Sequence, residues 1–160
     1  MSQEPFSHTD ASGELRMVDV SAKQSTLRSA RASCLVLTSV DALALPLLAN
    51  GLSAVQSARL EGIQAAKRTA QLIPLCHSLG LDDIHIDVVA HPRGVKIISS
   101  ATTISRTGVE MEALTASTFC ALSLLEALGE FDPAAQMSKL MVIQKSGGKS
   151  DWERDVDLDE

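Results

Sequence analysis

The chain has 160 residues, 45% of them apolar and 2% aromatic, with 14 basic and 20 acidic side chains. This length suits one domain, and the scarcity of aromatics predicts a core of aliphatic side chains. The net charge of −6 disfavours general nucleic-acid binding, which needs a basic surface. Three widely spaced cysteines without a Cys-x-x-Cys pair disfavour a zinc site and suit a reducing cytosol. There is no signal-peptide pattern and no apolar run of about 20 residues, so we expect a cytoplasmic protein outside the membrane.

The two ends of the chain differ from its middle. Residues 1–15 are polar and contain Pro, Gly and Ser, so we expect them to be flexible. Residues 16–150 carry the regular patterns and are predicted to form one domain. Residues 151–160 form an acidic tail with six carboxylates against one arginine. Without this tail the chain is close to neutral, which leaves room for a local cationic pocket.

The first predicted elements precede a glycine turn. Met17–Lys23 is a short extended segment whose two valines suit the edge of a sheet. We interpret Arg28 and Arg31, which follow it, as solvated surface arginines. Ala32–Ser39 has the β-branched and apolar content of a strand. Asp41–Ala49 is expected to be a short helix that a proline bends.

The middle of the chain predicts a helix, an apolar loop and a hairpin. A turn at Asn50-Gly51 precedes a helix that Ser53 caps and that runs to about Ala70, with small residues along one face. The loop that follows contains Ile-Pro-Leu-Cys-His, which is more apolar than an exposed loop tip. Leu81–Ala90 alternates apolar and polar residues, and Val95–Thr103 follows it after a turn, so the pair is predicted to be a β-hairpin.

The last third predicts a buried helix and a final strand. Thr107 and Glu110 have the spacing of a capping box, and the helix it opens runs to about Leu128. This helix is apolar around nearly its whole circumference and should be buried on all sides. In a domain with one sheet, that implies a partner on its second side, which we expect to be another subunit. Lys139–Lys145 is the last strand.

The order of the elements is therefore β-α-β-β-α-β. This is the split βαβ, or ferredoxin-like, arrangement, with an antiparallel sheet and both helices on one face. The six predicted elements are Ala32–Ser39, Ser53–Ala70, Leu81–Ala90, Val95–Thr103, Thr107–Leu128 and Lys139–Lys145.

Two kinds of residue are candidates for chemistry. Cations at the ends of elements would suit an anionic ligand such as a phosphate ester; these are Lys67, Arg68, Lys145 and Lys149. The stretch Lys-Ser-Gly-Gly-Lys-Ser lacks the spacing of a nucleotide-binding P-loop and has no helix after it.

The other candidates can accept or transfer protons. His77, beside Cys76, is either a structural histidine or a substrate-binding or proton-transfer group. Glu112 has no role in capping, and Glu126 lies among leucines, so either its helix turn is exposed or it is an acid or base facing a pocket. The two glutamates are 14 residues apart, about 21 Å along a straight helix. Only a site between two subunits could combine them.

Five motifs in order resemble those of cyclic pyranopterin monophosphate synthase, the molybdenum cofactor biosynthesis protein C family. They cover nearly the whole chain and are Met17–Lys23 (MVDVSAK), Gly62–Thr69 (GIQAAKRT), Ile73–His77 (IPLCH), Thr107–Ala116 (TGVEMEALTA) and Lys145–Ser150 (KSGGKS). The resemblance implies a ferredoxin-like fold in a homohexamer built from three dimers, with sites at dimer interfaces. It implies a lyase that converts 3′,8-cyclo-7,8-dihydro-GTP to cyclic pyranopterin monophosphate and pyrophosphate, without a metal or redox cofactor.

The resemblance also implies roles for residues of this chain. Leu75, Cys76 and His77, together with Met111 and Glu112, match segments that contact the substrate. The loop lysines Lys145 and Lys149 would meet the triphosphate together with Lys67, which would also assist proton transfers. Glu126 occupies the position of the family's catalytic aspartate.

The sequence departs from the family pattern where proton transfer is expected. The family's catalytic aspartate and lysine lie three residues apart, at positions that correspond here to Glu126 and Gly129. A second family lysine corresponds to Asn50, and the proline expected after Cys-His is Ser78. Because a positioned acid or base contributes about 10²–10⁴-fold, two hypotheses follow: an active or weakly active synthase, and a paralogue that keeps the fold, the oligomer and ligand binding without turnover.

Overall fold

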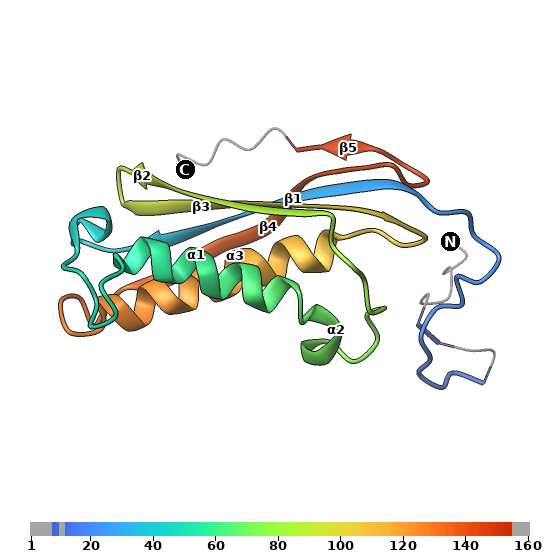
Figure 1. The fold of residues 1–160 in the computed structure, drawn as a ribbon, viewed down its shortest axis with the longest axis horizontal. Helices are drawn as coiled ribbons and strands as arrows, with labels where there is room; N and C mark the ends of the chain where they lie inside the picture. The colour runs from blue at the N-terminus through green and yellow to red at the C-terminus, as the bar shows by residue number, and fades with distance from the viewer. Residues whose placement is uncertain (1–7, 10–11, 155–160) are drawn as a thin grey trace.

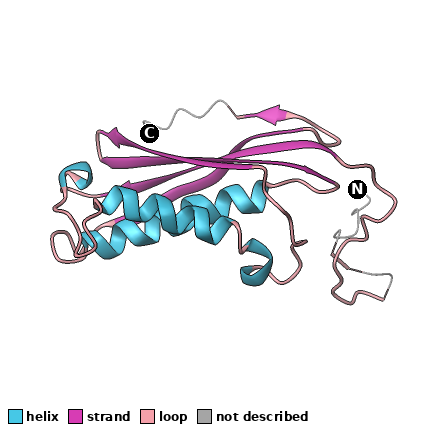
Figure 2. Cartoon of the chain, viewed as in Figure 1, coloured by secondary structure: helices cyan, strands magenta, loops and turns pink. Residues whose placement is uncertain are grey.

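The computed structural model describes residues 8–9 and 12–154, and in it a single sheet lies over two long helices (Figures 1 and 2). Both helices cover the same face of the sheet, and the strands extend in roughly the same direction as the helices. In chain order the elements are β1 (Thr26–Leu37), the 3-10 helix η1 (Ala42–Ala44), α1 (Ala54–Ala66), α2 (Thr69–Leu72), β2 (Asp83–His91), β3 (Gly94–Ser105), α3 (Glu110–Leu128), β4 (Gln136–Ser146) and β5 (Trp152–Glu153).

The sheet confirms the predicted ferredoxin-like arrangement. Its strand order is β2-β3-β1-β4-β5, and every pair of neighbours is antiparallel. The first four strands in this order are those of a split βαβ fold, in which β1 and β2 sit on either side of β3. The short strand β5 pairs with β4 and extends the sheet past the boundary predicted at residue 150.

The core between the sheet and the helices is aliphatic, as the composition predicts. Alternate residues of β1 and β3 point toward the helices, because successive side chains of a strand face opposite sides. Val36 and Ile97 are fully buried there and pack in one cluster with Leu124 and Leu128 of α3. This packing fixes the direction of α3 relative to the sheet, and so it decides which residues stand at each end of the helix.

A glycine lets α1 and α3 approach each other closely. A Cβ atom at Gly62 would lie 2.6 Å from the backbone oxygen of Ala116 and 2.6 Å from Cδ1 of Ile86. Real Cβ atoms do not come so near, so only glycine fits here without a shift. The small residues predicted on one face of this helix therefore serve the packing of the two helices.

Several predicted boundaries are wrong. Strand β1 begins at Thr26, six residues before the predicted start at Ala32, because its first residues pair with the end of β3. Residues 17–23 do not join the edge of the sheet. The predicted helix over residues 41–49 is reduced to η1, where the Asp41 carboxylate accepts a hydrogen bond from the Leu43 N–H over 3.1 Å.

Two helix ends also differ from the prediction. Helix α1 ends at Ala66 rather than near Ala70, and α2 follows as a separate four-residue helix. Ser53 does form the capping box of α1, with Gln56 as its partner. The capping box predicted at Thr107 is absent, because α3 begins after Val109 without a side-chain cap. The carboxylate of Glu110 instead forms an ion pair with Lys145.

Helix α3 is long and apolar enough to cross a membrane by length and composition alone. It is instead the central helix of the core, since it packs on the sheet and on α1 (Figure 1). The expectation that it is buried on all sides is only partly met. Leu122 is 46% exposed and Met111 38% exposed, so a single chain leaves part of this helix uncovered.

Candidate functional site

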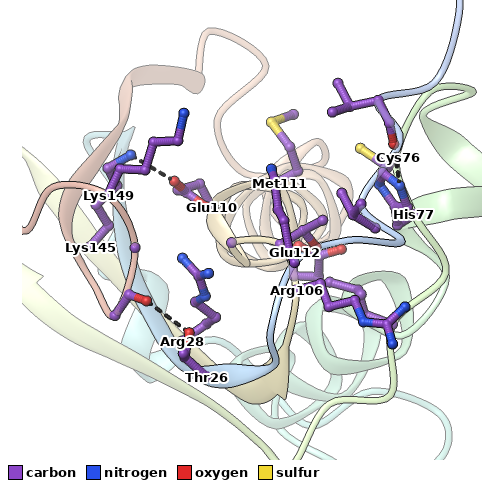
Figure 3. Close-up of a pocket in the computed structure, with 18 of the residues that line it drawn as sticks. Thr26, Arg28, Cys76, His77, Arg106, Glu110, Met111, Glu112, Lys145 and Lys149 are labelled. Carbon is purple, nitrogen blue, oxygen red and sulfur yellow. Dashed lines mark hydrogen bonds and ion pairs between the residues drawn. The ribbon is translucent and has the colours of Figure 1, made fainter. Parts of the chain in front are cut away.

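A cavity of about 770 Å³ opens at the N-terminal end of α3 (Figure 3). Segments from both halves of the sequence line it, because the antiparallel order brings the start of β1, the end of β4 and the start of α3 to one end of the molecule. The described lining residues are His8 and residues within 18–29, 75–79, 106–112 and 145–149. The cavity is large enough for a nucleotide-sized ligand.

All seven residues predicted to bind substrate line this cavity. Three come from the apolar loop before β2, two from the first turn of α3, one from the end of β4 and one from the loop after it. In that order they are Leu75, Cys76, His77, Met111, Glu112, Lys145 and Lys149. The structure thus brings together three motifs that lie up to about 75 positions apart in the sequence.

Cationic side chains dominate one side of the cavity. Lys145 forms an ion pair with Glu110, with 3.2 Å between Nζ and Oε1, and Lys149 lies beside it (Figure 3). The described residues that line the cavity include five cationic side chains and two carboxylates. The five cations are Lys23, Arg28, Arg106, Lys145 and Lys149. Such an excess suits a ligand with several negative charges, and arginine in particular matches phosphate oxygens.

Arg28 is not the solvated surface arginine that the sequence predicts. It is half-buried, it lines the cavity, and its Nε has no hydrogen-bond partner among the described residues. Its position in the strand could have revealed this, since Arg28, Ala30 and Ala32 alternate on the face of β1 that the helices cover. The prediction failed because it started the strand at Ala32 and left Arg28 outside the pattern.

The loop after β4 is held in place against the start of β1. The Thr26 hydroxyl donates to the Gly147 carbonyl over 3.0 Å, and the Ser29 and Ser146 hydroxyls lie 2.7 Å apart. Gly147 has a φ of 83°, and a Cβ atom there would collide with the backbone of Leu27. Gly147 and Gly148 therefore allow this loop to lie close to β1. This close approach places Lys145 and Lys149 at the cavity.

The opposite side of the cavity is apolar and contains a buried carboxyl group. Glu112 is 4% exposed, and burial raises its pKa, helped by the negative charge of Glu110. Burial also raises the pKa of the Cys76 thiol, and Glu112 adds to this effect. Cys76 is therefore not activated as a thiolate nucleophile. Glu112 is placed to accept hydrogen bonds from ligand N–H groups in a site with little water.

His77 is tied to the chain before β1. Its Nε2 lies 2.9 Å from the backbone oxygen of Val18 (Figure 3). A carbonyl oxygen only accepts, so Nε2 carries the hydrogen of this bond. The sequence leaves two interpretations open for His77, a structural histidine or a group that binds substrate or transfers protons. The bond to Val18 favours the structural interpretation, although His77 also lines the cavity.

The two residues predicted to be catalytic lie outside this cavity. Lys67 is exposed at the C-terminal cap of α1. Glu126 is exposed near the other end of α3, where it lines a second cavity of about 440 Å³ with Glu61 and Glu130. Within the described part of one chain, neither side chain reaches the residues predicted to bind substrate.

Two of the positions that depart from the family pattern, Gly129 and Asn50, lie near the second cavity, whereas Ser78 lies in the loop that lines the first. Gly129 is the C-terminal cap of α3, next to Glu130. Asn50 precedes Gly51 in a tight turn, and its side chain accepts a hydrogen bond from the Leu52 N–H over 3.0 Å. Among the described residues, no lysine or arginine lines this cavity. One end of α3 is therefore cationic and the other acidic.

Comparison with known proteins adds an independent line of observation. A model described as the MoaC family matches residues 17–148. The chain belongs to the MoaC family. The match begins at the first residue of the predicted extended segment and ends in the glycine loop between Lys145 and Lys149, so it spans nearly all of the cavity wall. The family resemblance predicted from the five motifs is confirmed.

Named relatives within this family are similar over almost their whole length. Cyclic pyranopterin monophosphate synthase 1 of Mycobacterium tuberculosis is 45% identical over 150 residues, which cover 91% of this chain and 87% of that protein. Synthase 3 of the same organism is 44% identical over 161 residues, covering 96% and 89%. The synthase of Streptomyces avermitilis is 43% identical over 156 residues, covering 95% and 91%.

Proposed function

We propose that this MoaC-family protein converts 3′,8-cyclo-7,8-dihydro-GTP to cyclic pyranopterin monophosphate and pyrophosphate, a step of molybdenum cofactor biosynthesis in the cytoplasm. The observation that carries this proposal is the cavity at the start of α3, whose described lining combines five cations with a buried carboxyl group, that of Glu112. The proposal draws support from relatives that are named as synthases of this product. Those names do not favour the alternative hypothesis, a paralogue without turnover.

The cavity suits the two ends of such a substrate. Lys145, Lys149 and Arg28 would bind the triphosphate, and they would stabilise the charge that develops on pyrophosphate as a sugar oxygen attacks the α-phosphorus and the bond to the β-phosphate breaks. Glu112 would accept hydrogen bonds from the N–H groups of the purine-derived ring, against the apolar wall that Leu75 and Cys76 provide. Met111, on the rim, would cover the ring.

Proton transfer would need groups that a single chain does not bring to this cavity. We place it at Glu126, with Lys67, in a site that two subunits share. Support comes from the length of α3: residues 112 and 126 lie about 21 Å apart along the helix, and part of its surface stays exposed in one chain. The full proposal is a homohexamer arranged as a trimer of dimers, in which each cavity receives the acidic end of α3 from a neighbour.

The reaction itself is tested by supplying the cyclised GTP derivative to the purified protein. The expected result is pyranopterin, detected after oxidation by its fluorescence, and one pyrophosphate for each substrate consumed. Boiled protein, and unmodified GTP in place of the derivative, serve as controls. If neither product forms while the protein still binds pyrophosphate, the synthase proposal fails and a binding function remains.

The shared site is tested by mixing two defective variants. Glu112→Gln and Glu126→Gln should each lower the rate when assayed alone. The two variants are mixed in equal amounts and allowed to exchange subunits. If each site takes Glu112 from one subunit and Glu126 from another, about one site in four then has both glutamates intact. Activity should therefore return to about a quarter of the wild-type value. The mass of the assembly is measured in parallel by light scattering. No recovery in fully exchanged mixtures would contradict the shared site.

A further inference from the structure

Residues 17–25, the strap, lie at the mouth of the cationic cavity. They have no helix or strand, and they lead directly into β1 at Thr26. Four of them line the cavity: Val18, Val20, Lys23 and Gln24. The strap is therefore part of the cavity wall, although it is not held by the sheet.

Very little attaches the strap to the rest of the protein. Two of its hydrogen bonds are internal: the Ser21 N–H donates to the Asp19 carboxylate over 2.8 Å, and the Lys23 N–H donates to the Val20 carbonyl over 3.0 Å. Among the described residues, the only hydrogen bond from the strap to another segment is the one between the Val18 carbonyl and His77. The internal bonds shape a turn, whereas the bond to His77 fixes where that turn lies.

The geometry of this bond restricts what His77 can do. Nε2 must donate, because the Val18 oxygen only accepts. In the neutral imidazole the acceptor is then Nδ1. While the strap is in place, Nε2 is occupied and cannot take a proton from a ligand. The hydrogen bond from Nε2 to the Val18 carbonyl therefore holds the backbone of the strap against the cavity wall.

We propose that His77 is a positioning residue that latches the strap over the cavity and so keeps Lys23 at the phosphate-binding side. Lys23 belongs to the strap and lines the same cavity as Arg28 and Lys149. When the latch opens, the strap can move as a unit about the start of β1, and the cavity loses one of its five cations. Binding of a polyanion would in turn favour the latched strap, since it attracts Lys23.

The latch can be tested without any turnover. Trypsin cleaves after lysine, so the rate of cleavage between Lys23 and Gln24 reports how often the strap opens. The variants are His77→Ala, which removes the bond, and His77→Gln, whose amide can donate from nearly the same place. His85→Ala is the matched control, because His85 is exposed on β2, away from both cavities. Hydrogen exchange of residues 17–25 gives a second measurement that does not depend on trypsin.

The expected result follows from the worth of one hydrogen bond. His77→Ala should be cleaved about two- to tenfold faster than the wild type, while His77→Gln and His85→Ala stay close to it. Pyrophosphate should slow the cleavage of the wild type and of His77→Gln, and much less that of His77→Ala. Cleavage of His77→Ala at the wild-type rate would overturn the latch, as would equal cleavage of the alanine and glutamine variants.

Turnover then separates positioning from proton transfer. This step rests on the proposed function, with KM and kcat measured on the cyclised GTP derivative. His77→Ala should mainly raise KM, and His77→Gln should restore much of the loss. A glutamine variant that keeps the strap protected yet loses kcat as fully as the alanine variant would overturn the positioning role. If even the wild type makes no product, the synthase proposal fails, but the cleavage rates still decide the latch.

Discussion

The two ends of α3 carry opposite chemistry. At its start, the helix meets a cavity with five cationic side chains and the seven residues predicted to bind substrate. At its end, the second cavity is lined by three glutamates, and the described residues place no cation there. The first end matches the family pattern except at Ser78, and the second contains the other departures from it. Glu112 at the first end and Glu126 at the second therefore lie about 21 Å apart along the helix, so a substitution at one end leaves the side chains at the other end of the same chain in place.

The largest effect should come from restoring the second end to the family pattern. We expect Glu126→Asp combined with Gly129→Lys to raise the rate of pyranopterin formation by about a hundredfold, because a positioned acid or base contributes that much or more. Gly129 has a helical backbone conformation, and a Cβ atom there lies 3.3 Å from the Glu126 carbonyl oxygen, so lysine needs only a small shift of the helix end. Glu130→Lys, one position along, is the control. Without a gain in rate, the alignment of this helix end is wrong.

At the first end, Glu112→Gln should weaken substrate binding by about tenfold to a hundredfold, the worth of hydrogen bonds to a charged acceptor. Since the raised pKa means that Glu112 takes up a proton at higher pH than an ordinary glutamate, KM of the wild type should begin to rise early as the pH falls. The glutamine variant should lack this dependence. KM is measured from neutral pH down to the limit of protein stability. If KM rises in the same way at low pH in both proteins, a group other than Glu112 causes the pH dependence.

Loss of Arg28 should affect the cationic side of the same cavity. We expect Arg28→Met to weaken pyrophosphate binding by about tenfold, because it removes a charge-assisted contact but keeps the apolar stem. Arg31→Met is the matched control, since Arg31 lies three residues on in the same strand and faces away from the cavity. Titration calorimetry with pyrophosphate measures both. If both variants lose the same amount of pyrophosphate affinity, the loss reflects the lower net positive charge of the protein rather than a contact of Arg28 with the ligand.

The smallest effect should come from the ion pair inside the cavity. Glu110 holds Lys145 and adds a negative charge where an anion binds. Its replacement in Glu110→Gln should strengthen pyrophosphate binding by about two- to fivefold, in line with the small worth of partly exposed ion pairs. The gain should shrink at high salt. Weaker binding by this variant would show that Glu110 orients Lys145 rather than competing with the ligand.

Much of the fold could be predicted because its signals are local. The alternation of Leu81–Ala90, the turn at Asn50-Gly51 and the long apolar helix each follow from neighbouring residues. The prediction failed where a distant partner decides the structure. Strand β1 begins at Thr26 because β3 and β4 lie beside it, and its polar first residues carry no strand signal of their own. The predicted cap at Thr107 failed because the helix begins only after Val109, and the Glu110 carboxylate pairs with Lys145.

The sequence by itself determined the family and the order of the elements, and it predicted seven residues that line one cavity, because motifs and hydrophobic periodicity are properties of short stretches of chain. Only the tertiary structure decided that Arg28 lines the cavity, that His77 holds Val18, and that Glu126 lies at the far end of α3. Each of these depends on the antiparallel order of the sheet, which places segments from both halves of the chain at one end of a helix. Contacts between such distant segments are set by packing, and no local pattern records them.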